Sequence, residues 1–177
     1  LMVLSYYSKV NLSLLVNTKQ KSGLHNIQSY FCLINLKDKI KIKKIDGKSD
    51  KINFTGPFSK LINKKDNSIK SVLVLLRKLK LISSCYSVVV KKKIPVFAGL
   101  GGGTSNAFTV MKYVLGKKLS KKNLNVVKKK IGSDLELFFY KQGFLKNLGS
   151  IINQKNKQTF FFILIKPPIK CSKREIY

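Results

Sequence analysis

The sequence predicts an α+β fold, and three observations favour this class. In the first third of the chain, apolar residues alternate with polar ones, which is the period of a half-buried strand. Residues 66–80 instead carry apolar residues at spacings of three and four, which is the period of an amphipathic helix. Hydrophobic residues make up 44% of the 177 positions, so the chain has enough apolar surface for a packed core and is not a disordered protein.

The elements before the first helix are expected to be strands. Gly23 marks a turn between the first two, and Asp46-Gly47 has the composition of a hairpin turn. We therefore expect Ile52–Phe54 to pair with Lys39–Ile45 across that turn. The four predicted strands are Tyr6–Val16, Ile27–Leu36, Lys39–Ile45 and Ile52–Phe54.

Three helices are expected next, each with residues that favour its ends. The first, Asp66–Lys80, is capped by Asp66 or Asn67, and a short buried strand, Tyr86–Val90, follows it. The second helix, Asn106–Leu115, is closed by Gly116. The third, Ser120–Ile131, has Ser120 as its cap and Gly132 as its stop.

The last third is expected to return to strands, at Leu135–Tyr140, Phe144–Asn147, Ser150–Ile152 and Phe160–Ile165. Phe160–Ile165 has five strongly apolar residues without alternation, so it is predicted to be buried on both faces. It ends at Pro167-Pro168.

The charge of the chain is strongly basic, with a formal net charge of +29 from 36 basic and 7 acidic residues. Such a balance normally favours a nucleic-acid partner. Only Arg77 and Arg174 are arginines, however, and arginine is the residue that base and phosphate recognition prefers. The lysines are also spread along the whole chain. We therefore interpret the charge as compositional drift in an A+T-rich genome and expect no specific nucleic-acid partner.

The sequence contains no apolar run of the length that crosses a membrane and no recognisable secretory signal. The cysteines, Cys32, Cys85 and Cys171, are odd in number and form no CxxC pair, which predicts neither a disulfide framework nor a zinc site. These features favour a reducing bacterial cytoplasm, with a plastid as the alternative, and no membrane partner.

The segment Pro95–Ala107 has the most unusual composition in the chain. Its four glycines, Gly99, Gly101, Gly102 and Gly103, lack a Cβ atom, so the backbone can approach a bulky anion closely. Thr104, Ser105 and Asn106 then open a helix, whose N-terminal N–H groups and dipole favour phosphate. This pattern predicts a phosphate-binding loop of a form other than the Walker loop, because no Gly-Lys-Ser/Thr follows.

Three further residues are candidates for chemistry. Asp134 follows a predicted helix in a chain with few acids, and a carboxylate at such a junction serves as a general base or as a turn residue. Lys9 lies on the first strand, where it either stabilises transferred phosphate charge or lies on the surface. His25, the single histidine, either contacts a substrate or is an exposed loop residue.

In this order, the segments resemble the GHMP kinase family. Pro95–Ala107 resembles the family's ATP loop, Pro-x-x-x-Gly-Leu-Gly-Ser-Ser-x-Ala, in its Gly-Gly-Gly-Ser-Ser-Asn-Ala form. Ser8–Leu12 resembles Ala-Lys-Ile-Asn-Leu, and Ile131–Asp134 matches Leu-Gly-Ser/Ala-Asp. Ser22–Phe31 resembles Asp-Gly-Tyr-His-x-Leu-x-Thr-x-Phe, although Leu24 stands where the family branch has a tyrosine that stacks on cytosine. This set is typical of the branch that phosphorylates the 2-hydroxyl of 4-diphosphocytidyl-2-C-methyl-D-erythritol in non-mevalonate isoprenoid precursor biosynthesis.

The resemblance implies ATP and Mg²⁺ as cofactors and assigns roles to individual residues. Asp134 would accept the hydroxyl proton, and Lys9 would keep Asp134 ionised and stabilise developing charge. Asn11, His25 and Phe31 would lie on the substrate side. No protein metal site is implied, since Mg²⁺ would come with ATP near Thr104 and Ser105. The implied nucleotide-binding residues are Pro95, Gly99, Leu100, Gly101, Gly102, Gly103, Thr104, Ser105 and Asn106.

The resemblance also implies a fold like the second domain of ribosomal protein S5, a mixed sheet with packed helices. It predicts an N-terminal ATP-binding domain at residues 1–158 and the start of a C-terminal domain at 159–177, whose remainder would be missing or separately encoded. In the family the second domain would cover Phe160–Ile165, so we expect this strand to be exposed here and the chain alone to be poorly soluble and nearly inactive. The alternatives are an inactive or split remnant, a basic RNA-binding module of the S5-like fold, and a GHMP kinase for homoserine or mevalonate.

Overall fold

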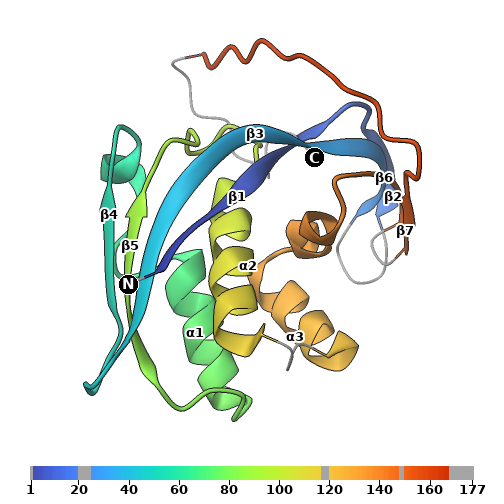
Figure 1. Ribbon diagram of the computed structural model, residues 1–177. Coiled ribbons are helices and arrows are strands. Elements are labelled where there is room, and N and C mark those ends of the chain that lie inside the picture. Colours follow the sequence, from blue (N-terminus) through green and yellow to red (C-terminus); the bar gives the residue numbers. More distant parts are fainter. Residues whose placement is uncertain (1, 20–24, 117–119, 148–149, 168–177) are drawn as a thin grey trace.

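The described part of the chain forms a curved seven-stranded sheet with three α-helices packed against one face (Figure 1). The computed structural model describes residues 2–19, 25–116, 120–147 and 150–167. The central path of the sheet runs β4-β5-β3-β6-β7, and β1 and β2 both pair with β3. The β4–β5 pair is parallel and the other pairs are antiparallel, so the predicted α+β class with a mixed sheet is confirmed.

The N-terminal strands differ from the prediction in their lengths. The predicted strand Tyr6–Val16 is divided into β1 (Met2–Asn11) and β2 (Leu15–Lys19), whereas the next two predicted strands form one continuous strand, β3 (His25–Ile45). The ladder is irregular at Ser13, whose hydroxyl oxygen accepts a hydrogen bond from the Tyr30 N–H over 3.1 Å. A side chain that occupies a backbone donor ends regular pairing at this point.

The expected hairpin between β3 and β4 is wrong. β4 (Lys51–Thr55) is a strand as predicted, but it pairs in parallel with β5 (Cys85–Lys91), which lies between β4 and β3. Val88 and Val90 of β5 are completely buried, so β5 occupies the interior position that burial of its apolar residues requires. The connection from β4 to β5 is a crossover through the first helix, which parallel strands need.

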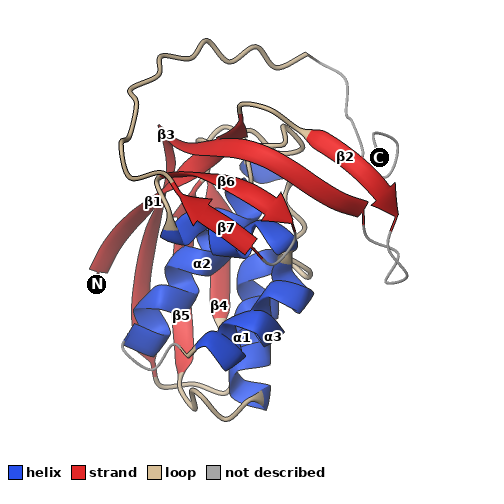
Figure 2. Cartoon of the chain, turned by 90° about the vertical axis from the view of Figure 1, so that its right-hand side faces the viewer, coloured by secondary structure: helices blue, strands red, loops and turns tan. Residues whose placement is uncertain are grey.

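The three helices agree with the sequence prediction in number and capping. They are α1 (Ser68–Lys78), α2 (Gly102–Leu115) and α3 (Lys121–Ile131). The Asn67 side chain accepts a hydrogen bond from the Lys70 N–H, and Ser120 caps α3 in the same way. α2 begins earlier than predicted, because Gly102 and Gly103 already adopt helical geometry. Figure 2 shows the helices on one side of the strands, where their buried residues form the core.

The segment after α3 is helical and not extended. The predicted strand Leu135–Tyr140 is instead a 3₁₀ helix, η3 (Ser133–Phe139), and a shorter one, η1 (Ser59–Leu61), follows β4. Leu135 and Phe138 are fully buried, and a short apolar run satisfies burial as either a strand or a helix. The next two strands, β6 (Gln142–Asn147) and β7 (Ser150–Asn153), are present as predicted, and they pair with each other in antiparallel orientation.

Residues 154–167 have no regular secondary structure and pass over the outer side of the sheet (Figure 1). The prediction of a strand at Phe160–Ile165 is wrong, because these residues form no regular secondary structure. Their exposure, 95% at Phe161 and 92% at Ile163, is what we expect of this segment without a second domain to cover it. A strand requires a partner for its N–H and C=O groups, and no described strand pairs with this segment. The side chain of Gln142 holds the segment at one point, where its amide oxygen accepts from the Gln158 N–H over 3.0 Å.

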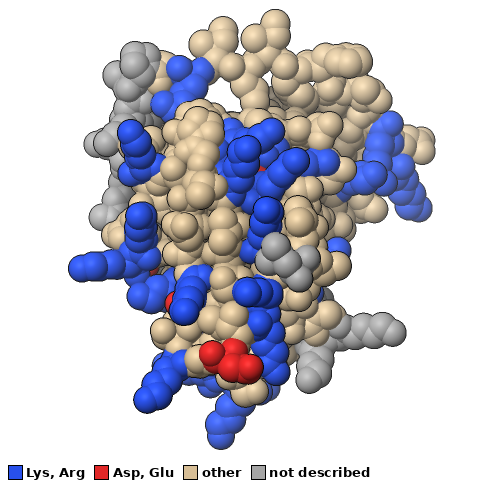
Figure 3. All heavy atoms as spheres, turned by 60° about the vertical axis from the view of Figure 1, so that its left-hand side comes forward, with Lys and Arg blue, Asp and Glu red and all other residues tan. Residues whose placement is uncertain are grey.

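Basic side chains are distributed over the whole height of the face drawn in Figure 3, with few acidic ones among them. Cys32 is buried as predicted, and burial raises the pKa of its thiol, whereas Cys85 is partly exposed. Cys171, by contrast, lies outside the described residues. Across the described ranges, every helix is too short or too polar to span a bilayer.

Tyr6 connects β1 to η3 through a hydrogen bond. Its hydroxyl donates a 2.5 Å hydrogen bond to the Phe138 carbonyl. We expect Tyr6→Phe to lower the free energy of unfolding by about 1 kcal/mol, because a buried carbonyl loses its donor.

Burial, and secondly Tyr7, raise the pKa of Tyr6, so its deprotonation is disfavoured in the folded state. The wild-type chain should therefore lose stability as the pH rises above about 10. Chemical denaturation from pH 8 to 11 measures both effects. An equally steep alkaline loss in Tyr6→Phe would contradict the role of Tyr6.

Candidate active site

Lys9 and Asp134 are brought together from distant parts of the chain. β1 carries Lys9, and the first turn of η3 carries Asp134. The ammonium nitrogen of Lys9 lies 3.4 Å from Oδ2 of Asp134, within the distance that the sequence analysis expects. Lys9 is 5% exposed, so its long side chain is held in one place and not free in solvent. The catalytic roles of the two groups stay a prediction.

Asn11 joins this pair on the same face of β1. Its side-chain oxygen accepts a hydrogen bond from the Lys9 ammonium over 3.1 Å. Residues two positions apart on a strand point to the same side, so β1 presents Lys9 and Asn11 together. The ammonium therefore lies between a carboxylate and an amide oxygen, and both contacts orient it.

The glycine-rich loop lies directly against Lys9. The backbone N–H of Lys9 donates to the carbonyl of Leu100 over 3.0 Å. Gly101 has a φ of +67°, and a Cβ atom at this position would lie 3.2 Å from both Cγ of Lys9 and Cζ of Phe138. Glycine is required here for two reasons, since the backbone is left-handed and the space is filled. The loop and the Lys9–Asp134 pair consequently form one site.

The N-terminus of α2 opens next to this contact. Gly101 precedes the helix without a side-chain cap, and its carbonyl accepts from the Ser105 N–H over 2.8 Å. Among the described residues, no acceptor is found for the N–H groups of Gly102, Gly103 and Thr104. The first N–H groups of a helix lack internal partners and, with the helix dipole, attract anions. The predicted arrangement of a glycine loop running into a helix is confirmed.

The three polar residues after the glycines differ in where their side chains lie. Thr104 is next to Gly132, with its hydroxyl 3.8 Å from where a Gly132 Cβ atom would be. The Ser105 hydroxyl is buried and donates to the Tyr7 carbonyl over 2.8 Å. Asn106 is buried and donates to Asp38. The Ser105 hydroxyl therefore donates its proton to β1, and the role of Ser105 in nucleotide binding stays a prediction.

The residues predicted for the substrate side are only partly assembled. Asn11 lies beside Lys9, and Pro95 is partly exposed ahead of the loop. Phe31 pairs with Asn11 in the ladder but is 1% exposed, because Gly143 covers its ring. Phe31 therefore presents no free ring face for stacking in this structure. The backbone of His25 begins β3, whereas the His25 side chain and Leu24 lie outside what the structure describes.

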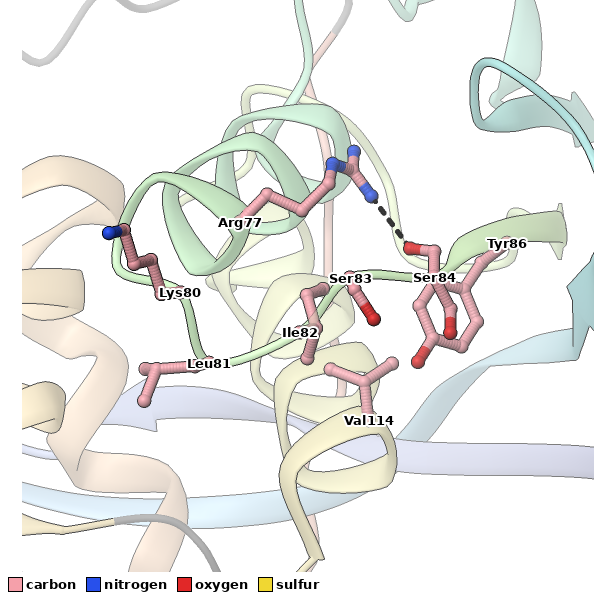
Figure 4. A pocket seen from close by; sticks show the side chains of 8 residues that line it. All are labelled: Arg77, Lys80, Leu81, Ile82, Ser83, Ser84, Tyr86 and Val114. Atoms are coloured by element: carbon pink, nitrogen blue, oxygen red, sulfur yellow. Dashed lines mark hydrogen bonds between the residues drawn. The ribbon is translucent and has the colours of Figure 1, made fainter.

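An open hollow is present elsewhere, at the C-terminal end of α1 (Figure 4). Its lining residues are Arg77, Lys80, Leu81, Ile82, Ser83, Ser84, Tyr86 and Val114. Arg77 donates to the Ser84 carbonyl over 3.1 Å and forms an ion pair with Asp50. The N-terminal residue of α1, Ser68, lies instead against Gly103, so the hollow and the glycine loop are at opposite ends of this helix.

Comparisons with known proteins agree with this geometry. Residues 67–140, which include the glycine loop and Asp134, match the GHMP kinases N terminal domain family. A 4-diphosphocytidyl-2-C-methyl-D-erythritol kinase of Pelagibacter ubique is 41% identical over 97% of this chain. The chain contains a GHMP kinase N-terminal domain. A kinase of the same name from Francisella tularensis is 32% identical over 97% of the chain. The chain spans 62% of the first relative and 63% of the second.

Solved structures of other proteins share the fold of this domain. A crystal structure of 4-(cytidine 5'-diphospho)-2C-methyl-D-erythritol kinase aligns with a TM-score of 0.64 at 22% identity, covering 86% of this chain and 54% of that one. Mevalonate pyrophosphate decarboxylase from Streptococcus pyogenes aligns equally well, with a TM-score of 0.64 at 14% identity over 98% of this chain and 58% of that protein. At these identities the likeness concerns the fold alone.

Two residues of the GHMP kinase domain that contact the loop region were not predicted from the sequence. Ser68 opens α1, and its hydroxyl lies 3.0 Å from where a Gly103 Cβ atom would be. Asp38 is 1% exposed on β3 and accepts hydrogen bonds from residues on both sides of the loop. An available indication for Asp38 was its position among lysines in an otherwise alternating strand, where an acid is uncommon.

Proposed function

We propose that this chain forms the nucleotide-binding part of a kinase that transfers the γ-phosphoryl group of ATP to the 2-hydroxyl of 4-diphosphocytidyl-2-C-methyl-D-erythritol. The observation that carries this proposal is the contact of Lys9 with both Asp134 and the glycine loop. The names of the two relatives supply the substrate. The reaction belongs to isoprenoid precursor biosynthesis.

The glycine loop fits a nucleotide phosphate chain. Gly103 is exposed, and the N–H groups of Gly102 to Thr104 are available to phosphate oxygens. At Gly102 a Cβ atom would lie 2.9 Å from Cγ2 of Ile94, so a larger residue would shift the start of α2. In the proposal, Pro95, Gly99 and Leu100 form the approach to this cradle. Ser105 and Asn106 hold its base from inside.

Asp134 and Lys9 have complementary tasks in the transfer. The Asp134 carboxylate takes the proton of the substrate hydroxyl as its oxygen attacks the γ-phosphorus. The bond from that phosphorus to the β–γ bridging oxygen breaks, so ADP leaves and a phosphate monoester forms. The Lys9 ammonium keeps Asp134 ionised and stabilises the negative charge that develops on the phosphoryl oxygens. Phosphoryl transfer depends mainly on such positioning and charge stabilisation.

Magnesium is compatible with the donors present. Among the described residues no cluster of three or more His, Cys, Asp or Glu side chains is found. In kinase sites Mg²⁺ keeps several of its waters and is bound largely through substrate phosphates. The Thr104 hydroxyl near Gly132 would supply a protein oxygen, and the ion would neutralise phosphate charge. Asn11, His25 and Phe31 are assigned to the cytidyl substrate, with a movement of Phe31 required for stacking.

Nucleotide binding and product formation test the proposal separately. We expect the folded chain to bind a non-hydrolysable ATP analogue with Mg²⁺ in isothermal titration. We expect a fusion of the chain with the part of the Pelagibacter relative that it does not cover to transfer labelled phosphate from ATP to the cytidyl substrate. A folded chain that binds no nucleotide would contradict the proposal, as would a fusion that phosphorylates homoserine or mevalonate instead.

A further inference from the structure

Asp38 is a buried carboxylate that the proposed reaction does not use. It lies on β3 opposite Tyr6 and is 1% exposed. Its Oδ1 accepts hydrogen bonds from the backbone N–H groups of Lys93, over 2.7 Å, and Ile94, over 2.9 Å. Its Oδ2 accepts from the Asn106 side-chain amide over 2.9 Å and forms an ion pair with Lys92. One carboxylate therefore binds four donors.

These donors belong to the two ends of the glycine loop. Lys92, Lys93 and Ile94 directly precede Pro95, whereas Asn106 lies in the second turn of α2. Between these points the loop contains three of the positive-φ residues, Phe97, Gly99 and Gly101. A loop with such backbone freedom does not by itself fix the distance between its ends. Asp38 sets that distance, because both ends bind the same group.

Lys92 places a positive charge next to the start of α2. Its ammonium lies 3.3 Å from where a Gly102 Cβ atom would be, at the first residue of α2, and Lys92 is 2% exposed. The N-terminus of a helix carries partial positive charge, so a buried ammonium there is unfavourable without a nearby anion. The Asp38 carboxylate supplies this anion and keeps the Lys92 ammonium next to the first residue of α2.

We propose that Asp38 is a positioning residue for nucleotide binding, which keeps the loop and the first N–H groups of α2 in the arrangement that accepts phosphate. This inference rests on the proposed function, since it concerns the same loop. It predicts that loss of the Asp38 charge weakens nucleotide binding more than an equal loss of stability elsewhere would. The change is expected to act on the loop and the start of α2, because the four donors that Asp38 binds lie there.

Asp50 provides a matched control. Its side chain is only 6% exposed, accepts from the Tyr86 N–H over 2.9 Å, and forms an ion pair with Arg77 beside the hollow at the far end of α1. We expect Asp38→Asn and Asp50→Asn both to lower the melting temperature. In isothermal titration of the 177-residue chain, Asp38→Asn should weaken binding of a non-hydrolysable ATP analogue with Mg²⁺ about 10- to 100-fold. Asp50→Asn should leave the affinity within about twofold, because it is remote from the loop.

Two further variants test the positioning role if Asp38→Asn alone does not fold. Asn106→Ala removes only the bond from α2 and should weaken nucleotide binding about tenfold. The exchange Asp38→Asn with Asn106→Asp restores one negative charge and should recover most of the affinity. Equal nucleotide affinity in the wild-type chain, Asp38→Asn and Asn106→Ala would overturn the positioning role while leaving the proposed function intact. A folded wild-type chain without nucleotide binding would overturn both.

Discussion

Replacing Asp134 with asparagine is expected to lower the rate of phosphoryl transfer about 10³-fold, with little change in nucleotide affinity. The amide cannot accept the hydroxyl proton, and it no longer pairs with the Lys9 ammonium 3.4 Å away. The α2 N-terminus and the glycine loop are unchanged, so ATP should still bind. The measurement is turnover of the cytidyl substrate by the fusion protein, together with titration of the ATP analogue.

Glu136 is the appropriate control for this change. It lies in the same 3₁₀ helix, two residues from Asp134, and its Oε2 is 2.5 Å from the Lys128 ammonium. Glu136→Gln removes the same charge from the same element. It should cost about 1 kcal/mol of stability or less and leave turnover within about threefold. If the two variants lost activity equally, a general loss of charge near η3 would explain the result and Asp134 would not be the base.

Replacing Gly101 with alanine is expected to lower turnover about 10²-fold, because it displaces the Lys9 side chain from Asp134. The new methyl group would lie 3.2 Å from Cγ of Lys9 and from Cζ of Phe138. Phe138 is completely buried, so it has no space in which to move. The left-handed backbone at this residue adds a further cost of about 1 kcal/mol.

Gly99 separates these two causes. It also has a positive φ, +69°, but a Cβ atom there would meet nothing within 4 Å. Gly99→Ala therefore carries the backbone cost of Gly101→Ala without its contact with Lys9. We expect Gly99→Ala to lose about 1 kcal/mol of stability and less than about fivefold in turnover. If both variants lost the same activity, loop strain and not the position of Lys9 would be responsible.

Most local features of the fold could be predicted from the sequence. The amphipathic spacing of residues 66–80 predicted α1, and a serine cap and a glycine stop predicted α3. Asn67 and Ser120 cap the two helices as expected. Each cap is a hydrogen bond between residues three positions apart in the chain, so a short stretch of sequence is enough to predict it. The glycine loop and the start of α2 are likewise local. Apolar runs were less informative, since most of 135–140 lies in the 3₁₀ helix Ser133–Phe139 and 160–165 formed no regular element.

Pairing between strands could not be predicted in the same way. Asp46-Gly47 favoured a hairpin, but the fully buried valines of β5 occupy the edge of β3 that the hairpin would have used. Which strand gains that edge depends on how much apolar surface each one buries against α1 and α2. This is a comparison between distant segments, and a local turn pattern does not contain it.

The sequence by itself determined which residues are chemically able to act: Lys9, Asp134, the glycines and the hydroxyls that follow them. The tertiary structure alone decided how those side chains are used. In the folded chain Lys9 pairs with Asp134, and the Ser105 hydroxyl donates to a carbonyl of β1. Gly143 packs on the ring of Phe31, and Asp38 accepts hydrogen bonds from the residues that precede the glycine loop. The physical reason is that residue type fixes the chemistry of a side chain, whereas its partners depend on which strands and helices pack around it.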